Sequence, residues 1–264
     1  IQLGNANEFE GNMDENAPYT FKSYENTFHI HVKSVAFYQI SKGAHITLYP
    51  CPDALMSDIR VYCLSNAFAA ALHQRKILPL HAGAIIHNDK LSLIMGAAGS
   101  GKSTLLFHLM QKGSKVFSDD VVVVSNSQDP NKMYATSSYP MMKLWKDQML
   151  CMGLHPKNQV RTGVDKFPFL FHETFEVQSR KIDKIVILKV VSDTKVCNIR
   201  KLKGAESMVS LSNQIYRKDY LHKIEFLAYL KLLASILNSV SCYEIRRPLF
   251  QSTENELVNL FNTI

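Results

Sequence analysis

The chain begins with alternating apolar and polar residues. After an irregular start over residues 5–20, residues 27–49 place apolar side chains at nearly every second position, as in FHIHV and HITLY. A period of two is typical of β-strands, because successive side chains point to opposite faces of a sheet. Ser41-Lys42-Gly43 supplies the residues of a turn. This part therefore predicts strands joined by a turn.

The period then changes to that of a helix. Residues 59–77 have apolar side chains at helical spacing and predict a helix. The next apolar runs, 80–86 and 91–95, are short enough for buried strands. The polar residues 87–90 between them predict a turn.

Further helices and strands follow in no regular β-α-β order. The predicted elements are a helix over 103–112 ended by Gly113, strands over 116–124, 133–136 and 184–191, a helix over 222–240, a strand over 241–247 and a helix over 252–263. Strands mixed with helices in this way predict an α/β or α+β fold with a mixed sheet. We expect a β-rich N-terminal part, residues 1–60, and a larger domain, residues 61–264.

Composition narrows the class of protein. The 264 residues are 46% hydrophobic and 20% charged, and no apolar stretch reaches the roughly 18 residues of a membrane span. The polar, acidic N-terminus is typical of neither a signal peptide nor a basic transit sequence. Five scattered cysteines without a CxxC pair predict reduced thiols, not a zinc site or a disulfide framework. These features favour a cytoplasmic protein.

The chain is basic, with a formal net charge of +7. Such an excess can attract nucleic acid, an acidic peptide or a nucleotide. The sequence has neither a basic run nor the alternation of aromatic and basic residues found in single-strand binders. We therefore favour a solvated surface plus a phosphate site, and expect no nucleic acid partner.

The segment GAAGSGKS, residues 96–103, fits the phosphate-binding pattern GxxxxGK[ST] and lies between a predicted strand and a predicted helix. Glycines let the backbone turn tightly, so that its N–H groups point at phosphate oxygens, and the helix adds its positive N-terminal end. Lys102 can reach the β- and γ-phosphates, and the Ser103 hydroxyl can bind Mg²⁺. The candidate nucleotide-binding residues are Gly96, Gly99, Ser100, Gly101, Lys102, Ser103 and Thr104.

Two adjacent carboxylates, Asp119 and Asp120, follow the helix predicted after this loop. In a strand parallel and adjacent to the one before the loop, they would lie near the γ-phosphate. One could accept a proton from an attacking hydroxyl and the other could hold Mg²⁺. Their mutual repulsion would raise one pKa, which suits a base. Asp193 is a rival magnesium ligand after the apolar run IVILKVVS, but we expect that run to be a structural strand.

Several other residues are weaker candidates. His81 precedes an apolar stretch and is typical either of a hydrogen-bonded core histidine or of a site residue. Arg161, Asp165 and Lys166 lie in a polar segment that predicts a loop. A basic residue of this loop, or Lys143, could neutralise charge on a transferring phosphoryl group. A solvated loop explains the same residues equally well.

Together these motifs resemble the catalytic domain of the HPr kinase/phosphorylase family. The resemblance rests on LHAGAI, then GAAGSGKSTLLFHLMQKG, then SDD. The chain is still more similar to the HPr-kinase-like proteins of peptide-modification clusters, including the lasso-peptide kinases. The shared segments are QRKILPLH, residues 74–81, and YPMMKLW, residues 139–145. The resemblance covers residues 62–190.

The resemblance implies a P-loop domain of the HPr kinase/PEP carboxykinase type. The residues it implies are Gly99, Gly101 and Lys102 for phosphate, Ser103 for Mg²⁺, and His81 in the lining of the active site. It also implies proton transfer by Asp119, with Asp120 supporting the metal. These two roles are open to exchange.

The sequence departs from the bifunctional HPr kinases at several positions. Thr104 stands where they carry Glu, and the acidic–basic–glycine run linked to their dephosphorylating reaction is not visible. Phosphorylase activity is therefore without support, and HPr is disfavoured as a substrate. Met142 stands where the relatives often have Arg, which leaves Lys143 as the charge of that segment.

The favoured hypothesis is an ATP- and Mg²⁺-dependent kinase of a hydroxyl, in particular of a serine in a peptide or small protein during ribosomal peptide maturation. A free serine or another small molecule is an alternative acceptor. A second hypothesis is a nucleotide-binding switch or scaffold without phosphotransfer. A third, an ATPase subunit of an RNA or transport machine, ranks last because the sequence lacks its signatures. The preference for ATP over GTP rests on the resemblance, which also implies a homo-oligomer.

Overall fold

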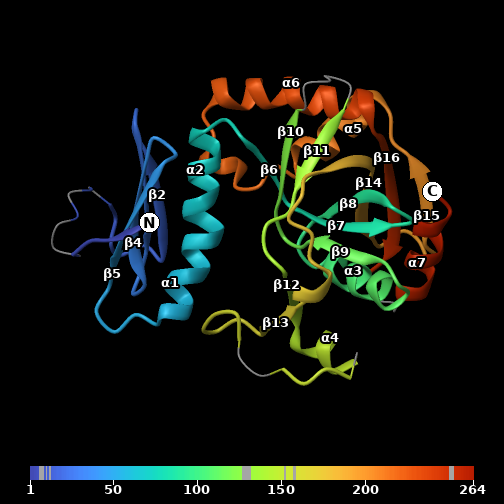
Figure 1. Cartoon of the computed structure of the whole chain (residues 1–264), viewed down its shortest axis with the longest axis horizontal. Coiled ribbons are helices and arrows are strands. Elements are labelled where there is room, and N and C mark those ends of the chain that lie inside the picture. Colours follow the sequence, from blue (N-terminus) through green and yellow to red (C-terminus); the bar gives the residue numbers. More distant parts are fainter. Residues whose placement is uncertain are drawn as a thin grey trace.

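The described part of the chain forms two large β-sheets with one long helix between them, and a separate two-stranded sheet (Figure 1). The computed structural model describes residues 1–5, 9, 11, 13–126, 132–151, 153–156, 159–249 and 253–264. Part of the irregular start predicted for residues 5–20, namely 6–8, 10 and 12, lies outside this set. Within the set, no helix combines the length and the apolar composition that crossing a membrane requires.

The smaller sheet explains the alternating pattern at the start of the chain. Its strands are β1 (Gln2–Leu3), β2 (Tyr19–Ser23), β3 (Thr27–Val32), β4 (Ala36–Ser41) and β5 (His45–Pro50). They pair in the order β1-β5-β4-β3-β2, with β1 parallel to β5 and the other pairs antiparallel. Every second residue of β4 is buried. The region 27–49 is β-structure as predicted, but it forms three strands where two were expected, because the chain also turns at Ser34, which has a φ of 60°. Lys42 and Gly43 form the predicted turn, both with positive φ.

A long helix follows this sheet and packs against it. The helix consists of α1 (Met56–Tyr62), a π-helical segment (Cys63–Ala67) and α2 (Phe68–Gln74), which confirms the helix predicted over 59–77. Apolar residues of all three segments join one hydrophobic cluster with β3, β4 and β5. Because a π turn takes one more residue than an α turn, it changes which side chains face inward. Here Asn66, a polar residue, is buried.

The larger sheet has nine strands and confirms the predicted mixed sheet. They are β6 (Leu78–Leu80), β7 (Ala82–His87), β8 (Lys90–Gly96), β9 (Lys115–Ser118), β10 (Val122–Asn126), β11 (Met133–Thr136), β14 (Arg180–Val191), β15 (Asn198–Lys201) and β16 (Ser241–Pro248). Seven follow the order β6-β10-β11-β14-β8-β7-β9, while β16 pairs with β14 and β15. The pairs β14–β8 and β14–β16 are parallel. The remaining pairs are antiparallel.

The sequence predicts that the strand leading to the aspartate pair is adjacent to the strand before the phosphate loop. In the structure these two strands are not adjacent. β7 lies between them and is antiparallel to both β8 and β9. The tight turn at Asn88 and Asp89, both with positive φ, folds β7 back onto β8. β7 therefore takes the place beside β8 where the sequence predicts the strand that leads to the aspartates. β9 nevertheless runs parallel to β8, so both end at the same edge of the sheet. His81, just before β7, lies at this edge as well.

The apolar run 116–124 forms two strands instead of the predicted single strand. The chain turns at Asp119 and Asp120, so that β9 pairs with β7 while β10 pairs with β6 and β11. Asp120 has a φ of 71°, in the left-handed region that non-glycine residues seldom adopt. Such a conformation costs on the order of 1–3 kcal/mol, and residues that adopt it cluster at functional sites.

Helices cover both faces of the larger sheet (Figure 1). They are α3 (Lys102–Gln111), α5 (Gly204–Ser212), α6 (Lys223–Ser239) and α7 (Glu254–Asn262), with 3₁₀ turns at His172–Thr174 and Lys218–Tyr220. α5 and α6 pack around one hydrophobic cluster, and α3 and α7 around another. The predicted helices at 103–112, 222–240 and 252–263 are therefore confirmed, whereas α5 was not predicted.

A short hairpin stands beside the phosphate loop. β12 (Met141–Trp145) and β13 (Lys166–Leu170) pair antiparallel, and α4 (Lys146–Cys151) follows β12. β13 corrects the predicted loop at 159–169, whose last residues are a strand. Met142 and Leu144 are buried in the core, so Lys143 and Trp145 lie on the opposite face of β12.

Buried polar side chains connect the smaller sheet to the larger one through Asn66. Its Nδ2 donates to Tyr19 Oη at 3.1 Å, and its Oδ1 accepts from Arg217 Nη2 at 2.6 Å. The Tyr19 hydroxyl also pairs with that of Tyr220. Asn66 therefore forms hydrogen bonds with one residue on each side of the long helix, Tyr19 and Arg217.

We expect Asn66→Ala to destabilise the protein. The change leaves Arg217 and Tyr19 each without one buried hydrogen bond, which costs about 1–3 kcal/mol of unfolding free energy. Urea unfolding would measure the loss. Asn238→Ala, at an exposed position of α6, is the matched control and should change stability by less than about 0.5 kcal/mol. Equal stability of the two variants would show that the Asn66 contacts add nothing.

Candidate active site

The phosphate loop lies between β8 and α3 and is shaped by two glycines. Gly96 has a φ of 148°, and a Cβ there would lie 2.5 Å from the carbonyl oxygen of Leu188 and 2.6 Å from Ser100 Oγ. Gly101, with a φ of 98°, is the N-cap of α3. Side chains would therefore disturb the loop at its start and at its junction with the helix. The helix N-terminus points its free N–H groups into the loop, where an anion is favoured.

Lys102 is held inside the loop. Its ammonium donates to the carbonyl oxygens of Gly96 at 2.7 Å and Ala97 at 3.2 Å, and only 8% of the residue is exposed. Burial lowers the pKa of Lys102, while the nearby Asp119 and Asp120 oppose that shift. A buried ammonium surrounded by loop carbonyls is a compact positive charge well placed for phosphate oxygens.

Asp119 is the buried carboxylate of the site and contacts the loop directly. The Ser103 hydroxyl lies 3.1 and 3.2 Å from its two oxygens, and the Lys143 backbone N–H donates to Oδ2 at 3.1 Å. Burial raises the pKa of Asp119, and the charge of Asp120 raises it further. The hydrogen bonds from Lys143 and Ser103 oppose this shift without cancelling it.

Asp120 has a different environment. Its Oδ2 lies 2.7 Å from Lys143 Nζ, and His81 Nδ1 lies 2.9 Å from its carbonyl oxygen and 3.4 Å from Oδ1. Burial opposes ionisation, but the Lys143 ammonium outweighs it and the pKa of Asp120 is lowered. Burial and the charge of Lys102 lower the pKa of His81. The pKa values of the two carboxyls are therefore moved in opposite directions, and Asp120 has 24% of its side chain exposed.

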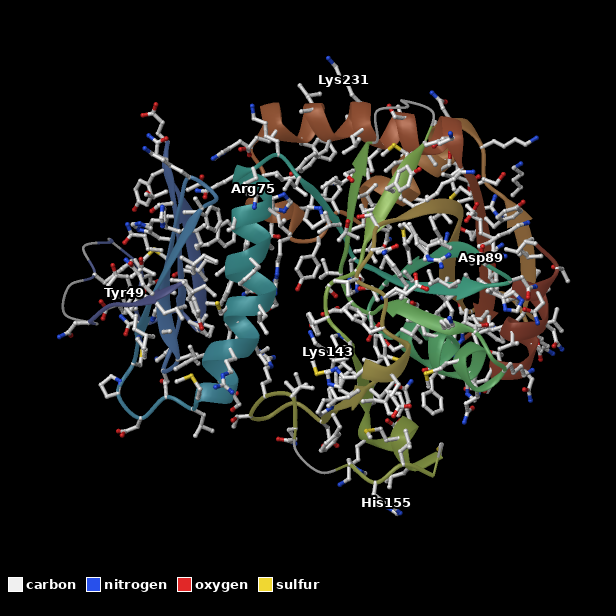
Figure 2. All side chains as sticks on the ribbon, viewed as in Figure 1. Tyr49, Arg75, Asp89, Lys143, His155 and Lys231 are labelled. Carbon is white, nitrogen blue, oxygen red and sulfur yellow. The ribbon has the colours of Figure 1, made fainter. Side chains whose placement is uncertain are left out.

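These groups line a cavity of about 600 Å³ between the long helix and the phosphate loop. Figure 2 shows Lys143 on the side of the larger sheet that faces α1 and α2. The lining residues are Val61, Tyr62, Ser65, His81, the loop and helix residues 98–104, Asp119, Asp120, Lys143, Trp145, Gln148, Val160, Arg161, Val164, Lys166, Tyr216 and Arg217. The cations outnumber the two carboxylates, so the cavity suits an anionic ligand.

The structure brings together most of the residues that the sequence predicted. His81, Asp119, Asp120, Lys102 and the loop from Gly99 to Thr104 all line the cavity, as do the weaker candidates Lys143, Arg161 and Lys166. Gly96 lies at the base of the loop and lines a second hollow.

Two weaker candidates lie elsewhere. Asp193 pairs with Arg246 at 3.1 Å and has 67% of its side chain exposed, so the rival magnesium ligand is outside the site. Asp165 accepts a hydrogen bond from Gln159 and does not line the cavity. The structural role expected for the strand before Asp193 is confirmed, because β14 is a central strand of the larger sheet.

Sequence reasoning missed the residues that close the cavity from the side of the long helix. Tyr62 and Ser65 come from α1 and the π-helical segment, and Tyr216 and Arg217 from the segment after α5. The Arg161 guanidinium donates to the Tyr62 hydroxyl across the cavity. Arg217 has a φ of 52°, a left-handed conformation with no signal in the sequence. These residues meet only through tertiary packing.

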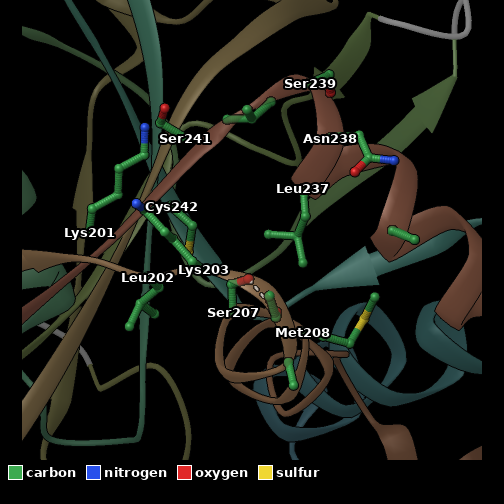
Figure 3. A pocket seen from close by; sticks show the side chains of 14 residues that line it. Lys201, Leu202, Lys203, Ser207, Met208, Leu237, Asn238, Ser239, Ser241 and Cys242 are labelled. Atoms are coloured by element: carbon green, nitrogen blue, oxygen red, sulfur yellow. Dashed lines mark hydrogen bonds between the residues drawn. The ribbon is translucent and has the colours of Figure 1, made fainter.

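Two other hollows are present. One, of about 570 Å³, lies on the other side of the phosphate loop and is lined by residues 96–100, Lys189 and Arg247 among others. The larger, of about 710 Å³, is formed by α5, α6 and β16 (Figure 3). Neither contains the aspartate pair or Lys102, so neither is the site predicted from the sequence.

The oxygen ligands of the site fit Mg²⁺. Magnesium is usually held by one or two carboxylates together with substrate phosphates, not by a cage of protein ligands. The Ser103 hydroxyl and the Asp119 carboxylate, in direct contact, provide such a partial set. No cluster of three or more His, Cys, Asp and Glu side chains occurs among the described residues. A complete protein-only metal site is thus not found there.

Comparisons with known proteins give a distant structural likeness. The sequence matches no family model and no curated protein. The structure is similar to that of the Hpr(Ser) kinase/phosphatase from Coxiella burnetii, with 12% sequence identity and a TM-score of 0.39. The match covers 70% of this chain and 94% of that chain. Similarity at this level shows neither a shared family nor a shared activity.

We expect Asp119→Asn to stabilise the protein at neutral pH. Because the folded-state pKa of Asp119 is raised, the folded protein binds this proton more tightly than the unfolded chain does. Stability is therefore lost as the pH rises from the ordinary aspartate pKa through the raised one. Asparagine has no such loss and keeps an oxygen for the Ser103 and Lys143 donors.

Thermal unfolding between pH 4 and pH 8 would measure this effect. The melting temperature of the variant relative to the wild type should rise by a few degrees towards pH 8, since each kcal/mol is worth roughly 2–4 °C at this chain length. Asp89→Asn, at an exposed position, is the control. A variant that loses stability at every pH would contradict the raised pKa of Asp119.

Proposed function

We propose that the protein is an ATP- and Mg²⁺-dependent kinase that transfers the γ-phosphoryl group to a hydroxyl. The observation that carries this proposal is the contact between the phosphate loop and the aspartate pair. Ser103 pairs with the buried Asp119, while the ionised and partly exposed Asp120 lies beside it in the same cavity. Such a site offers a phosphate cradle, a metal position and a proton acceptor within a few ångströms.

We assign the two aspartates by their contacts. In P-loop proteins, the loop Ser or Thr and a strand-end Asp hold Mg²⁺ together, which is the arrangement of Ser103 and Asp119. Asp120 is partly exposed to the cavity, where an acceptor hydroxyl can reach it, and we assign proton acceptance to it on this accessibility. This assignment exchanges the roles implied by the resemblance, an exchange that the sequence leaves open.

The other residues of the site hold the reacting groups in place and neutralise the negative charge of the phosphates. In the reaction, the acceptor oxygen forms a bond to the γ-phosphorus, the bond to the β–γ bridging oxygen breaks, ADP leaves, and the hydroxyl proton goes to Asp120. Lys102 stabilises the negative charge on the β- and γ-phosphate oxygens. Bound Mg²⁺ would neutralise further phosphate charge. Lys143 keeps Asp120 ionised and in place through its 2.7 Å contact.

The acceptor side of the cavity is formed by the long helix and the basic residues that face it. Tyr62, Ser65, Arg161 and Arg217 lie on this side, apart from the phosphate loop. We propose a serine hydroxyl of a peptide or small protein as the acceptor. Peptide maturation as its setting is supported by the resemblance of residues 74–81 and 139–145 to peptide kinases. A free serine would leave more of this wall without contacts.

Loss of the proton acceptor should abolish transfer but spare binding. With labelled ATP, Mg²⁺ and serine-containing peptides encoded nearby, we expect Asp120→Asn to lower the rate by about 10²–10⁴-fold. Calorimetry should show ATP binding within a few fold of wild type. Asp89→Asn should leave both unchanged. If wild type binds ATP but labels no hydroxyl, a nucleotide switch replaces the kinase.

The metal assignment has its own test. We expect Ser103→Ala and Asp119→Asn to weaken ATP binding in the presence of Mg²⁺ by at least about tenfold, because each removes an oxygen near the metal. Binding of ATP with EDTA should change little. Calorimetry with and without Mg²⁺ measures both. Should Asp120→Asn show the larger Mg²⁺ dependence instead, the two aspartates have the roles that the resemblance implied.

A further inference from the structure

An exposed aromatic ring stands at the edge of the candidate active site. Trp145 is the one tryptophan of the chain, and 41% of its surface is exposed although it lines the 600 Å³ cavity. It ends β12, on the face that also carries Lys143. An exposed indole ring leaves apolar surface in contact with water, which is unfavourable. A ligand that covered the ring would gain free energy from the burial of this surface.

The phosphate contacts give the direction in which a bound nucleotide extends. Lys102 and Ser103 serve the β- and γ-phosphates, and the aspartate pair marks the γ end. The α-phosphate and the nucleoside must therefore continue away from the aspartates. Lys143 contacts both aspartates, and Trp145 follows two residues later along β12, roughly 7 Å away for an extended strand.

The first turn of α3 is also connected to Trp145, through Gln148. Thr104, directly after Ser103, accepts a hydrogen bond from Gln148 Nε2 at 2.5 Å. Gln148 Oε1 in turn accepts from the backbone N–H of Trp145 at 3.3 Å. The free N–H groups at this helix end favour phosphate, so a nucleoside attached to that phosphate comes close to Trp145.

The surroundings of Trp145 have the chemistry of a base-binding site. Val160 and Val164 add apolar surface, and Gln148 adds an amide that can hydrogen-bond. Lys166, the cross-strand partner of Trp145, places its ammonium 4.6 Å from the ring centroid. This cation–π contact fixes the orientation of the indole. Small-molecule sites combine apolar walls with a few polar groups in this way.

The hollow on the other side of the loop is the rival position for a base. Its loop residues are Gly96 to Ser100, and it contains neither Thr104 nor any other residue of α3. A nucleotide with its base in that hollow would extend from the strand end of the phosphate loop. A nucleotide with its base at Trp145 would extend from the helix end of the loop. The contacts of Thr104 and Gln148 favour the helix end.

We propose that Trp145 is the platform on which the nucleoside base of the phosphate donor stacks, with Gln148 held beside it by Thr104. The inference rests on the proposed function, because it assumes a nucleotide in the loop. Aromatic stacking recognises the flat face of a base and not its edge. The platform therefore accepts adenine and guanine alike, and Gln148 is the residue that could distinguish them.

The tryptophan itself supplies the measurement. We expect MgATP to change the fluorescence of Trp145, whereas magnesium tripolyphosphate, which has phosphates but no base, should leave it nearly unchanged. Calorimetry should show that Trp145→Ala weakens MgATP binding by about 5- to 150-fold, the usual range for loss of one stacked base. The same variant should bind magnesium tripolyphosphate as the wild type does, which shows that it is folded.

Two further variants complete the design. Trp145→Phe keeps an aromatic face and should bind MgATP within a few fold of wild type. Leu150→Ala removes an apolar side chain that is also exposed, at 52%, but lies outside the cavity, and it should have no effect. If Trp145→Ala binds MgATP as tightly as wild type, the platform is wrong and the nucleotide-binding function stands. If wild type binds neither MgATP nor tripolyphosphate, the proposed function fails, and the platform fails with it.

Discussion

The antiparallel pairing of β7 with both of its neighbours is the constraint on which the site depends. Because β7 runs opposite to β8 and β9, its first residues lie at the edge where those two strands end. The register Ala82↔Met95 and Ala84↔Ser118 brings His81, the phosphate loop and the aspartate pair to this edge. Buried side chains on both faces of these strands hold the register, since a slip by one residue would exchange the side chains that pack against the two layers of helices.

The charges assembled at this edge favour function over stability. A carboxylate as buried as Asp119 is unfavourable unless donors surround it, and only Ser103 and the Lys143 backbone provide direct hydrogen bonds among the described contacts. Asp120 is compensated by the Lys143 ammonium but requires a left-handed backbone. Two neighbouring carboxylates with pKa values moved in opposite directions can divide metal binding and proton transfer between them.

Local motifs predicted the centre of the site, and long-range packing formed its walls. The loop at 96–103 and the aspartate pair were predicted because glycine, lysine and carboxylate spacings carry their chemistry in a short stretch, whereas His81 was a weaker candidate that rested on the resemblance. The run 116–124 predicts a single strand because apolar residues stand on both sides of the aspartates, and nothing in it signals the left-handed turn at Asp120.

No short sequence pattern predicts the residues that form the walls of the cavity. Tyr62 and Arg217 are far apart in the sequence and meet only when the long helix packs beside the larger sheet. The sequence did not predict the hairpin of β12 and β13, because Pro168 lies within its second strand and a glycine-containing segment precedes that strand. Elements with strong periods, such as β5 and α6, agree with the sequence prediction within a few residues, whereas the turn between β3 and β4 has no glycine or proline to predict it.

The π-helical segment lets the long helix contain one residue more than a continuous α-helix of the same course. A π turn takes up the extra residue within one turn, so α1 and α2 keep nearly the faces they would have in a regular α-helix. Deleting one residue within Cys63–Ala67 would therefore leave Tyr62 at the cavity wall, but it would remove one position from the segment that supplies both Ser65 of the cavity and the buried Asn66. The extra residue adds a polar position to the long helix without changing the direction in which the chain leaves it.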